Sequence, residues 1–211
     1  MCDALQVRWT ITAKTAPQPW IACSGCAGLR AFRPSGKIRL NANGRRLDAW
    51  LIYKCGDCDR TWNRPLFERQ AVRKIDPAIL EALQSNDPKW IRREAFNLEA
   101  LKRQSPRIHE FPEVEIAKEV VRDPNAWTRI AIELVVPLPT STRLDRLLAS
   151  ELAVSRTRLL ALQDRGVLRI EPDRTDVLRK RAKTGMIVML DLTAEADCAL
   201  SWRFQATGTA P

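Results

Sequence analysis

Alternation of apolar and polar residues predicts a β-hairpin in the first third of the chain. Ile38 and Leu40 alternate with polar residues between positions 37 and 41. A second alternating run reaches Cys55, and its apolar positions are Leu47, Ala49, Leu51 and Tyr53. Such a period of two is typical of strands with one buried face. Asn43-Gly44 lies between the runs and favours a tight hairpin turn.

Helix start signals follow in the middle of the chain. Asp76-Pro77 and Asp87-Pro88 each place a capping side chain before a proline suited to a first helical turn. We therefore expect two helices, the second ending at Ser105-Pro106, with one apolar face formed by Ile91, Ala95, Leu98 and Leu101. Trp90 and Phe96 are expected in the core rather than in a ligand platform.

Two further alternating runs, residues 114–120 and 130–136, predict a hairpin with a longer loop. Pro137 and Pro139 then indicate a domain boundary near residues 138–140.

The last third of the chain shows helix and strand signals in close succession. Residues 142–145 fit a capping box, followed by an apolar stripe of Leu144, Leu147, Leu148 and Leu152. Ser155 is the expected cap of a second helix that ends at Gly166, and residues 167–170 and 186–190 read as strands. The predicted fold class is α+β. The predicted domains are 1–75, 76–139, 140–192 and a tail, 193–211.

Two cysteine pairs flank the predicted hairpin. Cys23 and Cys26 form one pair, and Cys55 and Cys58 form the other. Four thiolates at this spacing close a tetrahedral shell around zinc and leave no position for water or substrate. We expect one structural Zn²⁺ per chain in a zinc ribbon, with small residues suited to the knuckles at Gly25, Gly28 and Gly56.

A redox dithiol or a disulfide is the alternative interpretation of each cysteine pair. The chain shows no signal peptide and no thioredoxin-like context, which favours reduced thiols in a cytoplasmic protein. Cys2 and Cys198 lack partners at ligand spacing and are expected to be free thiols.

Composition and charge narrow the function. The hydrophobic content of 45% is ordinary for a globular protein, and no apolar run approaches membrane-spanning length. A net charge of +10 favours a polyanionic partner, with nucleic acid ahead of an anionic membrane. One histidine, a closed metal site and no phosphate-binding glycine loop or nucleophile motif argue against an enzyme.

The positive charge is concentrated in the cysteine region and in the C-terminal third. Arg156 and Arg158 fall in the first turn of a predicted helix, where cations oppose the helix dipole unless a phosphate binds there. A solvated basic face is the alternative. The candidate RNA contacts are Lys37, Arg39, Arg45, Arg46, Arg143, Arg146, Arg156, Arg158, Arg165, Arg179, Lys180, Arg181 and Lys183.

The C-terminal third also resembles a known domain. The runs RLDRLL from Arg143, SRTRLL from Ser155, DRGVL from Asp164 and KTGMIV from Lys183 carry the resemblance. Their order is similar to the alpha-L RNA-binding domain first seen in small-subunit ribosomal protein four, over about residues 141–192. The resemblance implies binding of structured RNA through a two-helix face, with roles for Arg143, Arg156, Arg158 and Arg165.

A second resemblance covers most of the chain. The run SGKIRLNANGRRLDAWLIYKCGDC at residues 35–58, followed by Thr61-Trp62-Asn63, resembles the bacterial domain-of-unknown-function family 1062. That family supplies no activity. A possible recognition surface consists of Asn41, Asn43, Asp48, Trp50, Tyr53, Trp62 and Asn63, although turn chemistry and ribbon packing explain most of these equally well.

Taken together, the sequence predicts a non-enzymatic zinc-containing protein that binds structured RNA, plausibly ribosomal RNA. The alternative is a zinc-ribbon factor that binds DNA or a protein partner in transcription. Neither function requires a membrane.

Overall fold

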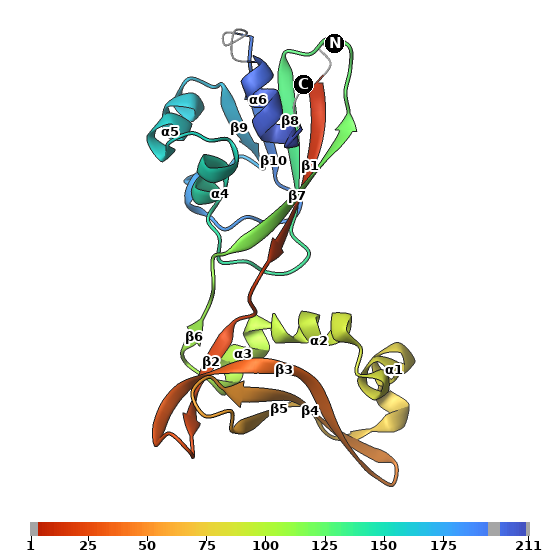
Figure 1. Ribbon diagram of the computed structural model, residues 1–211. Helices are drawn as coiled ribbons and strands as arrows, with labels where there is room; N and C mark the ends of the chain where they lie inside the picture. Colours follow the sequence, from red (N-terminus) through yellow and green to blue (C-terminus); the bar gives the residue numbers. More distant parts are fainter. Residues whose placement is uncertain (1–3, 194–198, 210–211) are drawn as a thin grey trace. The chain divides into compact units, whose positions relative to one another are not determined.

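A computed structural model describes residues 4–193 and 199–209, which form a mixed α and β protein. The chain divides into two compact units (Figure 1). Unit 1 consists of Met1–Lys14 and Phe111–Pro211, and unit 2 is Thr15–Glu110. This division differs from the four predicted domains, because residues 76–110 belong to unit 2 and residues 111–139 to unit 1. Within the described ranges, no helix combines the length and apolarity needed to cross a membrane.

Unit 1 is built on a sheet with the strand order β7-β1-β8-β10-β9. The strands are β1 (Ala4–Ala13), β7 (Val114–Arg122), β8 (Arg129–Val135), β9 (Leu168–Glu171) and β10 (Ile187–Asp191). β1 pairs antiparallel with β7 and parallel with β8. The predicted hairpin of residues 114–120 and 130–136 is therefore wrong, because β1 lies between these two strands.

Strand β1 has a clear physical reason to occupy an interior position in the sheet. Its side chains on one face, Leu5, Val7, Trp9 and Ile11, are almost completely buried. The Lys14 N–H donates a 3.1 Å hydrogen bond to the Glu113 carbonyl. The chain therefore leaves unit 1 and returns to it at neighbouring points, with unit 2 inserted between them.

Three helices share one core with the unit 1 sheet: α4 (Leu144–Glu151), α5 (Arg156–Asp164) and α6 (Ala199–Thr207). The Trp9 Nε1–H donates a 2.7 Å hydrogen bond to the Ala206 carbonyl of α6. The described part of the predicted tail is therefore mostly a packed helix. Cys2 and Cys198 lie outside the described residues.

The sequence predicted the ends of α5 correctly but not the start of α4. Ser155 accepts a hydrogen bond from the Arg158 N–H, and Gly166 follows α5 with φ +72°, as predicted. The capping box at residues 142–145 is wrong. Arg143 occupies the cap position without a side-chain cap, because the Thr142 hydroxyl donates to the Pro112 carbonyl instead.

Unit 2 has a sheet with the strand order β5-β4-β3-β2-β6. Its strands are β2 (Gln18–Cys23), β3 (Gly28–Asn43), β4 (Arg46–Cys55), β5 (Thr61–Ala71) and β6 (Ile108–His109). The predicted hairpin is confirmed as β3–β4, but its two turn residues are Gly44 and Arg45. Gly44 has φ +59° and takes the first turn position, which suits a turn that needs a positive φ there.

Helices α1 (Pro77–Ser85), α2 (Pro88–Ala95) and α3 (Leu98–Gln104) contribute to the unit 2 core. Asp76 and Asp87 cap α1 and α2 as predicted. The predicted second helix is in fact two helices, because the Asn97 side chain accepts a hydrogen bond from the Ala100 N–H and starts α3. Phe96 is buried and Trp90 packs against the core, as expected.

Candidate metal centre and cationic surfaces

The four cysteines lie on two chain reversals that follow strands β2 and β4. Cys23 ends β2 and Cys55 ends β4, while Cys26 and Cys58 lie in the turns that follow. Ala27 and Asp59, each directly after the second cysteine of its pair, have φ +46° and +57°. These left-handed residues turn each chain back toward the next strand. Sequence reasoning assigned this role to glycines instead.

Gly25 is needed for a different reason. A Cβ atom there would lie 2.6 Å from Arg60 Nε and 3.2 Å from Cys58 Sγ, so a larger residue would force the exposed Arg60 side chain to move and would crowd the second knuckle. The contact at Gly56 is less close: a Cβ atom would lie 3.3 Å from the Ala31 carbonyl oxygen, which accepts a 2.9 Å hydrogen bond from the Gly56 N–H.

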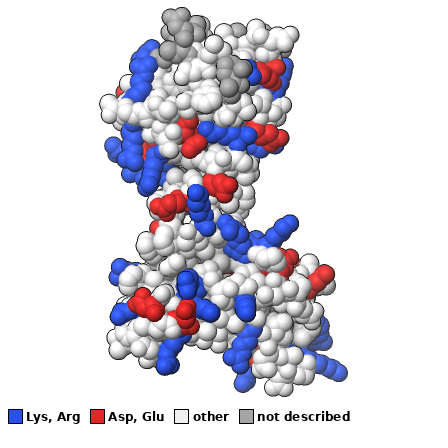
Figure 2. Space-filling view, viewed as in Figure 1, with Lys and Arg blue, Asp and Glu red and all other residues white. Residues whose placement is uncertain are grey.

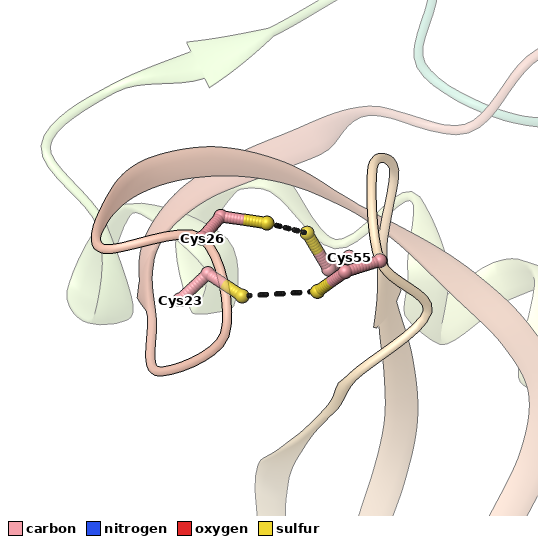
Figure 3. A group of neighbouring side chains, drawn as sticks. Cys23, Cys26 and Cys55 are labelled. Atoms are coloured by element: carbon pink, nitrogen blue, oxygen red, sulfur yellow. Dashed lines mark hydrogen bonds between the residues drawn. The ribbon is translucent and has the colours of Figure 1, made fainter.

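The four sulfur atoms converge on one point. Cys23 Sγ lies 3.5 Å from Cys58 Sγ, and Cys26 Sγ lies 3.9 Å from Cys55 Sγ. All four sulfurs lie within 4.8 Å of one another and can hold a metal ion. Figure 3 shows Cys23 and Cys26 on one knuckle facing the sulfurs of the other. Cys23 and Cys55 are buried, whereas Cys58 is exposed, so the cluster lies at the edge of the unit 2 core.

The proximity of the thiols affects their ionisation. Burial opposes ionisation of Cys23, but hydrogen bonds from the Gly25 and Cys26 N–H groups and from the neighbouring thiols lower its pKa to about 7. The hydrogen bond with Cys58, followed by burial, raises the pKa of Cys26 to about 12. The thiols therefore do not all ionise readily by themselves. A bound divalent cation changes this balance, because it deprotonates the thiols that coordinate it.

Two ion pairs join strand β3 to the second knuckle. Arg30 Nε lies 2.7 Å from Asp57 Oδ2, and Arg33 Nη2 lies 2.9 Å from Asp59 Oδ1. These contacts hold the Cys55–Cys58 turn against the strand that follows the Cys23–Cys26 turn. Because all four charged side chains are substantially exposed, each pair contributes little stability alone.

Several predicted cationic residues of unit 1 come together at the start of α4. The Leu144 N–H donates to the Lys180 carbonyl at 2.9 Å, and the Ala182 N–H donates to the Thr142 carbonyl at 3.1 Å. Arg143 and Arg181 consequently form a bridge pair between two short antiparallel segments. We call Arg143, Arg156, Lys180 and Arg181 the α4 cation cluster. Arg179 precedes Lys180 in the chain, and its guanidinium lies 4.0 Å from Asp176 Oδ1.

Asp145 moderates the charge of this cluster. Its carboxylate accepts hydrogen bonds from Arg143 Nε at 3.1 Å and Nη2 at 2.7 Å, and Arg156 Nε lies 4.0 Å away. Arg156 remains 60% exposed at its side chain. The Asp145 carboxylate thus engages Arg143 bidentately.

Other predicted cations of unit 1 lie outside the α4 cation cluster. Arg158 is in the first turn of α5, whereas Arg165 follows its last residue, about 10 Å further along the helix. Arg146 lies within α4, and Lys183 follows the segment that contains Arg181. The implied two-helix face therefore does not bring all of the predicted arginines to one place.

The predicted cations of unit 2 lie along its hairpin. Lys37 and Arg39 are exposed on β3, and Arg45 and Arg46 are exposed at the turn. The turn end borders a pocket of about 580 Å³ whose lining residues are Gly44, Arg45, Arg46, Ala71, Val72 and Arg73. Figure 2 shows Lys and Arg side chains on the surface of both units, with Asp and Glu among them.

The residues predicted to form a recognition surface lie on opposite faces of the unit 2 sheet. Tyr53 is fully buried and packs against Trp62, with ring centroids 5.3 Å apart. Asn41, Asn43, Asp48, Trp50 and Asn63 belong to the opposite face. Burial of Tyr53 also raises the pKa of its hydroxyl to about 12.

Lys54 belongs to the basic cysteine region but is absent from the candidate RNA contacts that the sequence suggested. It lies on β4, four residues after Trp50, and therefore on the same face of the strand. The alternation that identified Leu51 and Tyr53 as buried could have assigned Lys54 to this face.

Comparison with known proteins identifies one family. The family model described as "Protein of unknown function (DUF1062)" matches residues 40–174, which include Cys55 and Cys58 and follow Cys23 and Cys26. No curated protein and no solved structure matches the chain. The resemblance of residues 141–192 to the alpha-L RNA-binding domain is not shown by these comparisons.

Proposed function

The chain belongs to the DUF1062 family, whose function is unknown, and we propose from its own residues that it is a non-enzymatic, zinc-containing protein that binds structured RNA. The α4 cation cluster carries this proposal. Its residues come from separate parts of the chain, and their gathering at one place is the arrangement that phosphate contacts require.

The donor atoms of the metal centre support zinc. A tetrahedron with four zinc–sulfur bonds of about 2.3 Å has sulfur–sulfur edges of about 3.8 Å. The Cys23–Cys58 and Cys26–Cys55 distances of 3.5 and 3.9 Å lie close to that value. Four thiolates fill the coordination shell, so the ion would be structural, one per chain, and the hairpin with its two knuckles would be a zinc ribbon.

Phosphate binding explains why cations lie where helix energetics do not favour them. Arg156 occupies the first position of α5, where the helix dipole is positive and repels a cation. A phosphate at this end would interact favourably with both Arg156 and the helix dipole. Lys180 is exposed on the neighbouring segment and offers a second contact. Contacts to phosphates and to overall shape suit a folded RNA such as ribosomal RNA. Protein side chains cannot easily reach the bases in the deep major groove of an RNA helix.

The experiment compares the full-length protein with two double variants, using a fluorescein-labelled RNA hairpin and fluorescence anisotropy at low salt. Arg156→Gln with Lys180→Gln removes two charges from the α4 cation cluster. Lys102→Gln with Arg103→Gln removes two exposed charges from α3 and is the matched control. We expect the first variant to lose about tenfold or more in affinity, because charge-assisted hydrogen bonds contribute about 1.5 to 3 kcal/mol each.

The result that overturns the proposal is equal binding by both variants, or no binding of the RNA hairpin by the wild-type protein. Unlabelled duplex DNA is added as competitor to distinguish the two nucleic acids. Displacement by duplex DNA at lower concentration than by RNA would favour a DNA-binding factor instead.

A further inference from the structure

One face of the β3–β4–β5 sheet carries a polar and aromatic surface that the metal centre does not use. The register pairs Arg39 with Trp50, Lys37 with Ile52, and Trp50 with Pro65. Paired residues point to the same side of a sheet. We call this surface the outer face and define it by Lys37, Arg39, Asn41, Trp50, Ile52, Lys54, Asn63 and Pro65.

The outer face is the side of the sheet opposite to the helices of unit 2. The alternate residues of β4, such as Leu51, are fully buried in the cores to which α1, α2 and α3 contribute. Figure 1 shows these helices on one side of the sheet. Every residue that defines the outer face is exposed or half-buried, so the surface is accessible within unit 2.

The charges of the outer face favour a polyanion. Lys37, Arg39 and Lys54 are exposed around the half-buried side chains of Trp50 and Ile52. Among the acids of this region, Asp48 already accepts a hydrogen bond of 2.6 Å from the Arg69 backbone N–H. Asp59, at the second knuckle, pairs with Arg33 at 2.9 Å. Asp48 lies on the same face, opposite Asn41, and keeps its negative charge, so the three cations around Trp50 outnumber this carboxylate.

Trp50 gives the face its specific chemistry. The Arg39 guanidinium carbon lies 5.9 Å from the centroid of the indole ring, so a cation and an aromatic plane are adjacent. Such pairs stack on the planes of nucleic-acid bases. Asn41 and Asn63 lie on the neighbouring strands, where their amides can donate to and accept from base edges.

These features favour a single nucleic-acid strand over a double helix as the ligand. In a duplex, the bases stack on one another, and an indole cannot reach their planes. An unpaired segment exposes its bases for stacking while its phosphates contact the surrounding cations. The three β-strands together span about 10 Å, a width that suits a single nucleic-acid strand better than a duplex.

We propose that the outer face binds an unpaired RNA segment, in which one base stacks on Trp50 and neighbouring phosphates contact Lys37, Arg39 and Lys54. This inference rests on the proposed RNA-binding function and adds the single-stranded part of the RNA. In this arrangement, the structured part of the RNA contacts unit 1 and its unpaired part contacts unit 2.

The test measures the affinity of the full-length protein for an unstructured ten-nucleotide RNA of A and C, beside the RNA hairpin used above. Trp50→Ala should weaken binding of the unstructured RNA by about tenfold or more, since the base that stacks on the indole ring would lose its aromatic partner. Trp50→Phe should retain most of the affinity. Leu200→Ala, which truncates an exposed apolar side chain in unit 1, is the matched control and should bind normally.

Lys54→Gln provides a readout that does not depend on the packing of Trp50. Because Lys54 is exposed, this variant should fold normally and bind the unstructured RNA several-fold more weakly. Hairpin binding should be unchanged in all of these variants.

The outcomes separate this inference from the function on which it rests. Normal affinity of Trp50→Ala and Lys54→Gln for the unstructured RNA, with intact hairpin binding, would overturn the outer-face assignment alone. Failure of the wild-type protein to bind either RNA would overturn the RNA-binding function as well. A DNA strand of the same sequence that bound as tightly would contradict the assignment to RNA, because the 2′-hydroxyl would then make no contribution.

Discussion

Removing the metal should unfold unit 2 selectively. The Cys55→Ser substitution deletes one thiolate from the four-sulfur cluster at a fully buried position. With the cluster intact, the metal joins Cys26 to Cys55 and closes a loop of about 30 residues, which removes about 3.6 kcal/mol of chain entropy from the unfolded state. For a unit of about 100 residues, this loss lowers the unfolding temperature by roughly 15 to 25 °C.

Calorimetry and hydrogen exchange with mass spectrometry measure this effect. We expect Cys55→Ser, and chelator treatment of the wild-type protein, to lower the unfolding temperature and to remove amide protection from residues 15–110. Protection of β1 and β8 should remain, since the core of unit 1 contains none of the four cysteines. Ser24→Ala changes an exposed residue of the first knuckle and should behave like the wild type.

Two outcomes would refute this reasoning. A chelator that removes the metal without changing the protection of unit 2 would show that the cluster contributes no folding energy. An equal loss of protection in both units would show that the effect is not confined to unit 2.

Three further predictions concern individual contacts. Glu94→Ala should cost about 3 to 5 kcal/mol in a urea titration, because it leaves the Arg64 guanidinium buried at 1% exposure without its 2.8 Å carboxylate partner, whereas Arg64→Met should cost less. Ser155→Ala should lower the free energy of unfolding by about 1 kcal/mol, and an unchanged value would mean that the cap contributes nothing. Hydrogen bonds from the Thr193 hydroxyl and N–H lower the pKa of Asp191. The wild-type protein should therefore be more stable than Asp191→Asn above about pH 4, and this difference in the free energy of unfolding should disappear as the pH falls through the lowered pKa. A difference that persisted at lower pH would contradict this assignment.

Short-range signals predicted the hairpin, the caps and the cysteine cluster. The turn at Gly44, the caps at Asp76 and Ser155, and the two cysteine pairs each depend on a few adjacent residues. Their geometry follows from backbone and side-chain chemistry that the sequence displays directly. The resemblance to the DUF1062 family was likewise carried by one continuous run, and the family match over residues 40–174 confirms it.

Long-range pairing could not be predicted in the same way. β1 and β8 are parallel partners more than 100 residues apart, and two alternating runs that follow each other give no sign that a third strand separates them. The signal for β1 itself was available, since Leu5, Val7, Trp9 and Ile11 alternate with more polar residues. The break at Asn97 was hidden because the apolar face continues across it, with Ile91 and Leu101 both buried.

The candidate site shows the same limit. The cysteine ligands were readable from their spacing, but the left-handed residues Ala27 and Asp59 that aim them were not, because neither residue type signals a positive φ strongly. The gathering of Arg143 and Arg181 depends on a bridge between distant segments. The separation of Trp50 from Tyr53 was readable, because residues three apart on one strand point to opposite faces of the sheet.

The most direct test of the RNA-binding account is the salt dependence of affinity for the RNA hairpin. The account predicts that the logarithm of the association constant falls steeply and linearly with the logarithm of salt concentration. The slope should decrease in magnitude by about 2 in the variant with Arg156→Gln and Lys180→Gln, and should be unchanged in the variant with Lys102→Gln and Arg103→Gln. A slope that is the same in all three proteins, or an affinity that does not respond to salt, would contradict the account.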